Sequence, residues 1–225
     1  MNCYLFDIDG TIIASAEGHK DSFAVAFNQV VNVDVSIHEV EFSGCTDFEI
    51  IQRLATSHSI ELSRDNLVKI ENTMTRYYAS VSRNIEIEPV RGTEETLLRL
   101  RDAGHRIELL SGNLREIAHA KLEKAGLWHL FDSGTFGDYA PNRNDLVKSA
   151  ISGRADRNFN ERFVVGDTPK DVVAAVTNGL SAIAVLTGGY DEKTLVDSGA
   201  SVVLDSVADL ISLDLQPSSA AAIAA

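Results

Sequence analysis

The chain has 225 residues, of which 44% are hydrophobic and 24% charged, so it can bury a full core and is not a disordered chain. Its formal net charge of −13 argues against nucleic acid as a partner, because an acidic protein repels a polyanion. Cys3 and Cys45 are too few for a disulfide framework and suit a reducing cytoplasm, where we expect the protein to be. Apolar runs fall short of the roughly 20 residues of a membrane helix, and we expect neither a signal peptide nor a membrane partner.

The first predicted element is a buried strand over residues 3–8, which form a short apolar run. Helical patterns follow. Apolar residues keep helical spacing over 23–31 and again over 67–81. Between them Thr46 precedes Glu49 by three residues, and this pair predicts a capping box at the start of another helix.

Beyond Pro89 the pattern changes, because helix and strand signals now alternate. Such alternation indicates a parallel sheet that is covered by helices on both faces. The predicted helices are 93–102, 114–125, 145–152 and 169–178, and the predicted strands are 106–110, 135–136, 162–165, 181–186 and 201–204. The fold class predicted is therefore α/β, with a Rossmann-like parallel-sheet core and an inserted all-helical cap.

Two domains are predicted from this order of elements. Residues 1–13 and 89–215 form the α/β core, residues 14–88 form the helical cap, and 216–225 form a flexible tail. Ligands of open parallel sheets bind beyond the carboxyl ends of the strands. A cap that leaves from that end is expected to lie over the site as a lid.

Polar residues suited to chemistry follow three of the predicted strands. Asp7 and Asp9 follow the first, Ser111 follows the second, and Asp167 and Asp171 follow a later one. Carboxylates that converge on one crevice repel each other unless a cation binds among them. Hard oxygen ligands in this number suit Mg²⁺, which also accepts a phosphate oxygen as a ligand.

Each of these motifs alone also fits a structural role. Asp-x-Asp-Gly-Thr is typical of a turn after a strand, and Gly-Asp-Thr-Pro-Lys-Asp is typical of a capped helix start. A calcium-binding EF-hand loop is excluded, because Gly10 comes two positions early and Gly18 stands where the bidentate Glu belongs. The ordered set of acids and hydroxyl, each at a strand end, favours catalysis over these local explanations.

With this set of motifs the chain resembles the haloacid dehalogenase superfamily, and within it the phosphoglycolate-phosphatase-like branch with a helical cap. The resemblance runs from Phe6 to about Val203. It rests on Phe6-Asp7-Ile8-Asp9-Gly10-Thr11, Leu109-Leu110-Ser111-Gly112-Asn113 and Val164-Val165-Gly166-Asp167-Thr168-Pro169-Lys170-Asp171. It implies a phosphatase that acts on a small phosphorylated metabolite, as a monomer or a homodimer.

The resemblance also implies roles for the acids. Asp7 would attack phosphorus and form an aspartyl-phosphate. Asp9 would protonate the leaving oxygen and then take a proton from the hydrolytic water. The cofactor Mg²⁺ would bind the carboxylates of Asp7 and Asp167 and the backbone carbonyl of Asp9, with Asp171 supporting this set.

Phosphate binding is assigned in the same way. Ser111 would donate a hydrogen bond to a phosphate oxygen, helped by residues of the neighbouring turns, which are Gly10, Thr11, Gly112 and Asn113. The family usually supplies a Lys where this chain has Ala140. Arg143 is the favoured replacement because a guanidinium can reach a phosphate by another path, and Lys148 is the alternative.

Substrate specificity is expected in the cap. His19 lies near its start, and the stretch Gly44-Cys45-Thr46 resembles the cap loop that contacts the substrate in related enzymes. Three alternatives to a phosphatase remain. A β-phosphoglucomutase-type phosphomutase is disfavoured by Asp47, which stands where mutases have Arg, and a dehalogenase is disfavoured by Asp9. A binding or regulatory protein of weak activity is the third, and the absent Lys leaves room for it.

Overall fold

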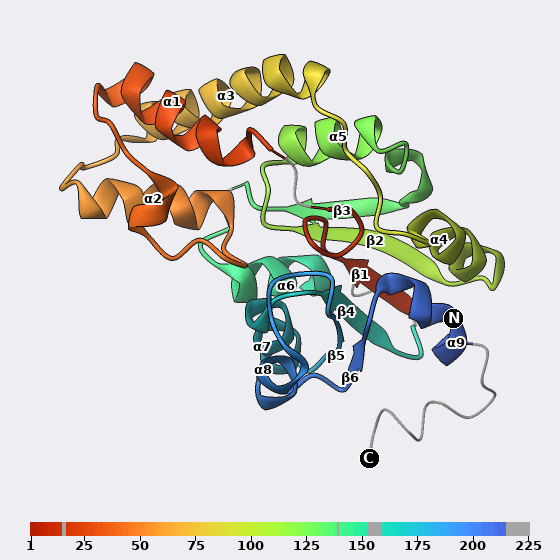
Figure 1. The fold of residues 1–225 in the computed structure, drawn as a ribbon. Coiled ribbons are helices and arrows are strands. Elements are labelled where there is room, and N and C mark those ends of the chain that lie inside the picture. Colours follow the sequence, from red (N-terminus) through yellow and green to blue (C-terminus); the bar gives the residue numbers. More distant parts are fainter. Residues whose placement is uncertain (15–16, 139, 153–158, 215–225) are drawn as a thin grey trace.

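The computed structural model describes residues 1–14, 17–138, 140–152 and 159–214. These residues form a six-stranded parallel sheet in the order β3-β2-β1-β4-β5-β6, which confirms the predicted α/β fold class (Figure 1). The strands are β1 (Cys3–Phe6), β2 (Arg106–Ser111), β3 (Ser133–Phe136), β4 (Arg162–Gly166), β5 (Ser181–Val185) and β6 (Val202–Leu204). The strand order reverses at β1, so the crevice beyond β1 and β4 is where such a sheet binds ligands.

Helices cover both faces of the sheet because its central strands are apolar on both sides. Tyr4 and Phe6 of β1 point into one apolar layer, and Cys3 and Leu5 point into the other. The first layer is closed by α4 (Thr93–Asp102), α5 (Arg115–Lys124) and α9 (Leu210–Asp214), and the second by α6 (Arg143–Ser152), α7 (Pro169–Thr177) and α8 (Glu192–Asp197).

The predicted bounds differ from the structure at two places that affect the site. The first strand was predicted to reach residue 8 but ends at Phe6, because the Ile8 carbonyl turns to accept hydrogen bonds from the N–H groups of the following residues. The helix predicted to begin at residue 145 begins at Arg143, and the Asn142 side chain accepts a hydrogen bond from the Asp145 N–H at 2.9 Å. Arg143, which we expected on a loop, therefore belongs to the first turn of α6.

Only one of the two hydrogen bonds of the capping box predicted at Thr46 is formed. The Thr46 hydroxyl accepts a hydrogen bond from the Glu49 N–H at 3.1 Å, as predicted. The Glu49 carboxylate instead pairs with the Arg53 guanidinium, one turn further along the helix, at 2.6 Å. A positive partner at this spacing competes with the backbone N–H for the carboxylate.

The inserted segment contains the helices α1 (His19–Val31), α2 (Asp47–Ser57) and α3 (Arg64–Val81). They enclose an apolar cluster of their own, and their largest fully buried side chains are Phe23, Phe27, Ile51, Leu54 and Tyr78. Leu114 and Ile117, at the start of α5, belong to the same cluster. The cap helices therefore pack on the core through the beginning of α5 (Figure 1).

The chain crosses between the cap and the core through two backbone segments that lie side by side. Ile13 and Pro89 form an antiparallel bridge, the Ala14 N–H donates to the Glu88 carbonyl at 3.2 Å, and the Val90 N–H donates to the carbonyl of residue 12 at 3.0 Å. The division into two domains at residues 13/14 and 88/89 stays a prediction. The predicted tail over 216–225 lies outside the described residues.

Within the described residues, no helix is both long and apolar enough to cross a bilayer.

Candidate active site

Three buried carboxylates meet at the carboxyl end of the sheet. Asp7 follows β1, Asp167 follows the neighbouring strand β4, and Asp171 lies in the first turn of α7. One oxygen atom from each lies within 4.8 Å of the others, an arrangement that can hold a metal ion. The side chain of Asp9 is not part of this group.

The pKa values of two of these acids reflect their crowding. Burial raises the pKa of Asp7 to about 7, although the Arg143 guanidinium acts in the opposite direction. Burial, followed by repulsion from Asp7 and Asp171, raises the pKa of Asp167 to about 8. A cation among these oxygens would favour their ionised forms, so the donor set and its electrostatics fit a hard divalent ion.

Arg143 supplies the positive charge at this cluster. Its Nη2 donates to Asp7 Oδ1 at 2.7 Å and to the Leu110 carbonyl at 3.1 Å, and it pairs with the Asp171 carboxylate. Burial opposes its charge, but the neighbouring acids keep the pKa of the guanidinium above its ordinary value. Lys148, the alternative considered from the sequence, is exposed to solvent.

Close packing of backbone fixes the position of the Asp167 carboxylate. A Cβ atom on Gly10 would lie 2.6 Å from its Oδ2, and one on Gly188 would lie 2.0 Å from the same atom. Gly10 also has a left-handed φ of 79°. Thr11 was predicted to bind phosphate, but its hydroxyl is fully buried and donates to Asp167 Oδ1 at 3.2 Å. Gly188 thus belongs to the site, although no motif around it predicted this.

The Ser111 hydroxyl, which was predicted to bind phosphate, is hydrogen-bonded to Asn113. The Ser111 hydroxyl is fully buried and accepts hydrogen bonds from the backbone N–H and the Nδ2 of Asn113, at 3.2 and 2.7 Å. Asn113 Nδ2 also donates to Asp9 Oδ2 at 2.8 Å. Ser111 therefore braces Asn113, while Gly112 and Asn113 themselves line the cavity.

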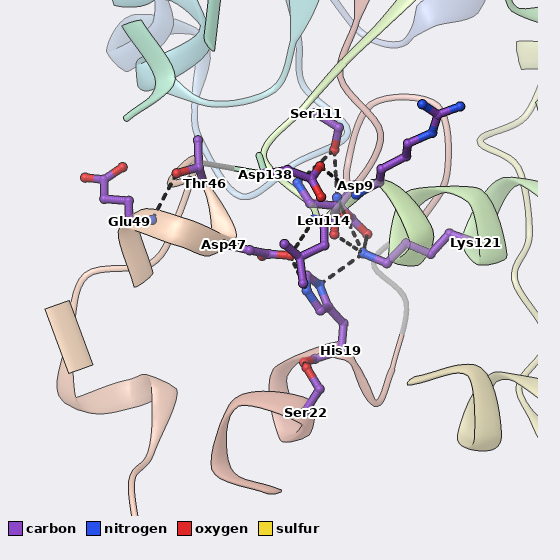
Figure 2. A network of polar contacts seen from close by, with 12 residues as sticks. Asp9, His19, Ser22, Thr46, Asp47, Glu49, Ser111, Leu114, Lys121 and Asp138 are labelled. Carbon is purple, nitrogen blue, oxygen red and sulfur yellow. Dashed lines mark hydrogen bonds and ion pairs between the residues drawn. The ribbon is translucent and has the colours of Figure 1, made fainter. Parts of the chain in front are cut away.

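Lys121 is a site residue that the sequence analysis missed. Its Nζ donates to both carboxylate oxygens of Asp9, at 2.8 and 2.6 Å (Figure 2). It also donates to Asn113 Oδ1 at 2.8 Å. The side chain is only 1% exposed, on the buried face of α5 beside Leu122. A lysine at an apolar position of a helix is seldom buried without a partner, and that position was the available signal.

The charge of Lys121 sets the ionisation of Asp9. Burial of this carboxyl favours its neutral form, but Lys121 and His19 outweigh burial and hold the pKa of Asp9 below its ordinary value. Asp7 and Asp9 thus lie two residues apart with pKa values displaced in opposite directions. Such a separation allows two carboxyl groups to take different roles.

His19 and Asp47 connect this pair to the cap. His19 Nδ1 lies 3.2 Å from Lys121 Nζ, and its Nε2 lies 3.1 Å from Asp47 Oδ2. The same oxygen of Asp47 accepts a hydrogen bond from the Leu114 N–H of the core at 2.7 Å. Figure 2 shows the resulting chain of contacts from the cap to Asp9.

The predicted cap loop lies against the core. A Cβ on Gly44 would lie 2.6 Å from the Thr168 hydroxyl. Cys45 Sγ accepts a hydrogen bond from Lys170 Nζ at 2.9 Å, and burial raises the pKa of the thiol. Thr46 is fully buried, and its hydroxyl donates to the carbonyl of residue 140 at 2.6 Å. Gly44 and Cys45 line the cavity, whereas Thr46 fastens the loop to the core.

A cavity of about 380 Å³ joins these parts. Its core side carries Asp7, Asp9, Lys121, Arg143 and Asp167, and its other side is formed by the cap. Glycines and paired charges line the core side of this cavity, and the rest of its volume lies toward the cap. Such a cavity suits a small anionic group that carries a larger substituent.

The sequence pattern of the haloacid dehalogenase-like hydrolase family matches residues 4–185, which include Asp7, Asp9, Lys121, Arg143 and Asp167. The chain belongs to this family. The predicted family membership is confirmed: this chain is a haloacid dehalogenase-like hydrolase.

Several curated proteins are similar to this chain over most of its length. A phosphoglycolate phosphatase of Vibrio parahaemolyticus is 27% identical over 218 residues, which are 92% of each chain. The pyrophosphatase PpaX of Halalkalibacterium halodurans is 24% identical over 95% of this chain and 96% of its own. Among solved structures, a hydrolase from Pseudomonas syringae superposes with a TM-score of 0.72 at 19% identity, covering 94% of this chain and 97% of that chain.

The raised pKa values predict how the metal-free hydrolase responds to pH. Folding raises the pKa of Asp7 and Asp167 from 3.8 to about 7 and about 8, so the folded state holds protons that the unfolded state has released. Stability should therefore fall as the pH rises from about 4 to about 8. Thermal melting with a chelator present should show this fall, and Asp167→Asn should flatten it.

The exposed acid Asp65 provides the control for that experiment. Asp65→Asn should leave the slope as in the unaltered chain. A melting temperature that rises over the same pH range, or equal slopes for Asp167→Asn and the unaltered chain, would contradict the assigned cause.

Proposed function

We propose that this hydrolase is a phosphatase, which hydrolyses a small phosphate monoester with Mg²⁺ and through an aspartyl-phosphate on Asp7. The observation that carries the proposal is the position of Asp7. Its carboxylate follows β1, lines the cavity and accepts a hydrogen bond from a guanidinium at 2.7 Å, and one of its oxygens lies within 4.8 Å of an oxygen of each of two further acids. Relatives named phosphoglycolate phosphatase, and a similar fold solved with phosphate, support this assignment.

The two carboxylates of the first motif divide the reaction between them. An oxygen of Asp7 attacks phosphorus, the bond to the alcohol oxygen breaks, and the alcohol takes the proton of Asp9. Asp9 then takes a proton from a water that attacks the aspartyl-phosphate, which releases phosphate and restores Asp7. Without substrate Asp9 is held in its ionised form by Lys121. A phosphate dianion beside it raises its pKa and allows it to hold the proton that the first step needs.

Mg²⁺ would be held by the carboxylates of Asp7 and Asp167 and the backbone carbonyl of Asp9, with Asp171 beside them. When bound, the ion offsets the negative charge of the phosphate and its acid neighbours. The chain's own residues orient the substrate. Gly10, Gly112 and Asn113 line the cavity at the acids, and Arg143 supplies a second positive charge.

The nucleophile is tested by Asp7→Asn. The amide resembles the carboxylate in size but is a poor nucleophile and a weaker metal ligand, so turnover of p-nitrophenyl phosphate with Mg²⁺ should vanish. Asp21→Asn, at an exposed position in the first turn of α1, is the control and should keep its activity. Activity of Asp7→Asn within about tenfold of the unaltered enzyme would show that Asp7 is not the nucleophile.

Arg143→Ala tests the second cation. Loss of one donor placed at the transferring group should lower kcat by about 10²–10³, while the Mg²⁺ requirement persists because the acids are unchanged. Lys148→Ala, at an exposed position of the same helix, should have little effect. The opposite order of the two variants would assign the cation to Lys148. Steady-state phosphate release over a range of Mg²⁺ concentrations measures both effects.

Lys121→Met tests the partner of Asp9. Methionine fills the same buried space without the charge, so Asp9 loses the contact that holds it ionised and in place. We expect kcat to fall by about 10²–10³ with a smaller change in KM, and the acidic limb of the pH profile to move upward. Lys124→Met, exposed in the last turn of the same helix, is the control. An unchanged acidic limb would contradict the role of Lys121.

A further inference from the structure

We propose that the alcohol part of the substrate is apolar, so that the enzyme acts on phosphate monoesters of aliphatic or aromatic alcohols with few hydroxyl groups. This inference rests on the proposed phosphatase function and concerns the cap side of the same cavity. That side is walled by Phe23, Ile37, Phe42 and Ile50. Phe23, Ile37 and Ile50 are buried in the cap cluster, and Phe42 is half-buried at its edge.

The polar cap side chains that line the cavity are already engaged with the protein. His19 lies between Lys121 and Asp47, and Asp47 accepts the Leu114 N–H (Figure 2). Ser43 Oγ accepts a hydrogen bond from the Tyr190 hydroxyl at 3.0 Å. The hydroxyls of a sugar would have to compete with these bonds, and a buried hydroxyl without a partner lowers affinity.

Charge in the cap argues in the same direction. Among the described cavity residues, the cap contributes the basic side chains His19 and Lys20. His19 is held by Asp47, and Lys20 is exposed with its ammonium 4.7 Å above the Phe42 ring. A second phosphate or a carboxylate on the substrate could therefore meet Lys20 at the exposed edge of the wall, whereas the buried part of the wall presents apolar side chains and Asp47 adds negative charge nearby.

The size of the cavity agrees with this substrate class. About 380 Å³ extends from the acids to the cap wall, far more than a phosphate with a two-carbon substituent fills. An apolar chain or ring would cover the wall, and each methylene group removed from water contributes favourably to binding. The wall lies away from the reacting atoms, so its contacts with the substrate strengthen binding and leave the phosphoryl transfer step unchanged.

A series of primary alkyl phosphates tests the inference, because ethyl, butyl and hexyl phosphate share one leaving-group chemistry. The test measures kcat/KM for phosphate release and includes glycerol phosphate and 2-phosphoglycolate as polar competitors. We expect kcat/KM to rise about threefold for each added methylene that reaches the wall, with hexyl phosphate the best substrate. A preference for either polar competitor, or no dependence on chain length, would overturn the inference and leave the phosphatase function standing. No release from any member would overturn both.

Phe42→Gln and Phe48→Gln form a matched pair of variants. Both phenylalanines are half-buried in the cap and pack against its apolar cluster, but Phe42 lines the cavity and Phe48 does not. The ratio of kcat/KM for hexyl over ethyl phosphate should fall about tenfold in Phe42→Gln and stay unchanged in Phe48→Gln. Equal ratios in the two variants would contradict the wall at Phe42. Thermal melting shows whether each variant folds, and the substrate series on the unaltered enzyme decides the question if one does not.

Discussion

Repulsion among three buried carboxylates is the constraint on which the rest of the site depends. Asp7 and Asp167 come together because the neighbouring parallel strands before them end at one edge of the sheet, and Asp171 in the first turn of α7 brings a third oxygen within 4.8 Å of theirs. Like charges at such distances in a poorly solvated place cannot all stay ionised without a cation. Arg143 on α6 offsets part of this negative charge by pairing with Asp7 and Asp171. The negative charge that is left favours the binding of a divalent ion. The Asp167 carboxylate must also keep its position in this group. Glycines surround it because a Cβ atom at Gly10 or Gly188 would overlap its oxygens.

A second ion pair, between Asp9 and Lys121, keeps the other acid of the motif out of this group. The two carboxylates lie two residues apart on a tight turn, yet Asp7 contacts a cation of the core and Asp9 contacts a lysine that also touches the cap residue His19. Their pKa values are displaced in opposite directions as a result. One acid can act as nucleophile and the other can carry a proton because their partners differ, although their sequence context is nearly the same.

Much of this was predictable from local patterns. Alternating elements predicted the sheet, and the rule that ligands bind at the carboxyl ends of strands singled out Asp7 and Asp167, which the structure brings together. Contacts across long stretches of chain were not predictable in this way. Lys121 is 112 residues from Asp9, and only its position on a buried helix face set it apart from a surface lysine. Likewise, the Ser111 oxygen accepts two hydrogen bonds from Asn113, a pairing that the motif around Ser111 did not predict.

The contact between cap and core has a consequence for specificity. The loop around Cys45 is docked so closely that a Cβ on Gly112 would lie 2.4 Å from the Cys45 carbonyl, and the Asp47 N–H donates to the Gly112 carbonyl at 2.7 Å. In such a contact, polar groups of the cap form hydrogen bonds with backbone or charged groups of the core, because water is excluded and buried polar groups need partners. The buried cap side chains that face the cavity without such bonds are apolar, and the proposed substrate preference rests on them. The residues that fasten the cap over the acids therefore also limit which alcohols can be presented to them.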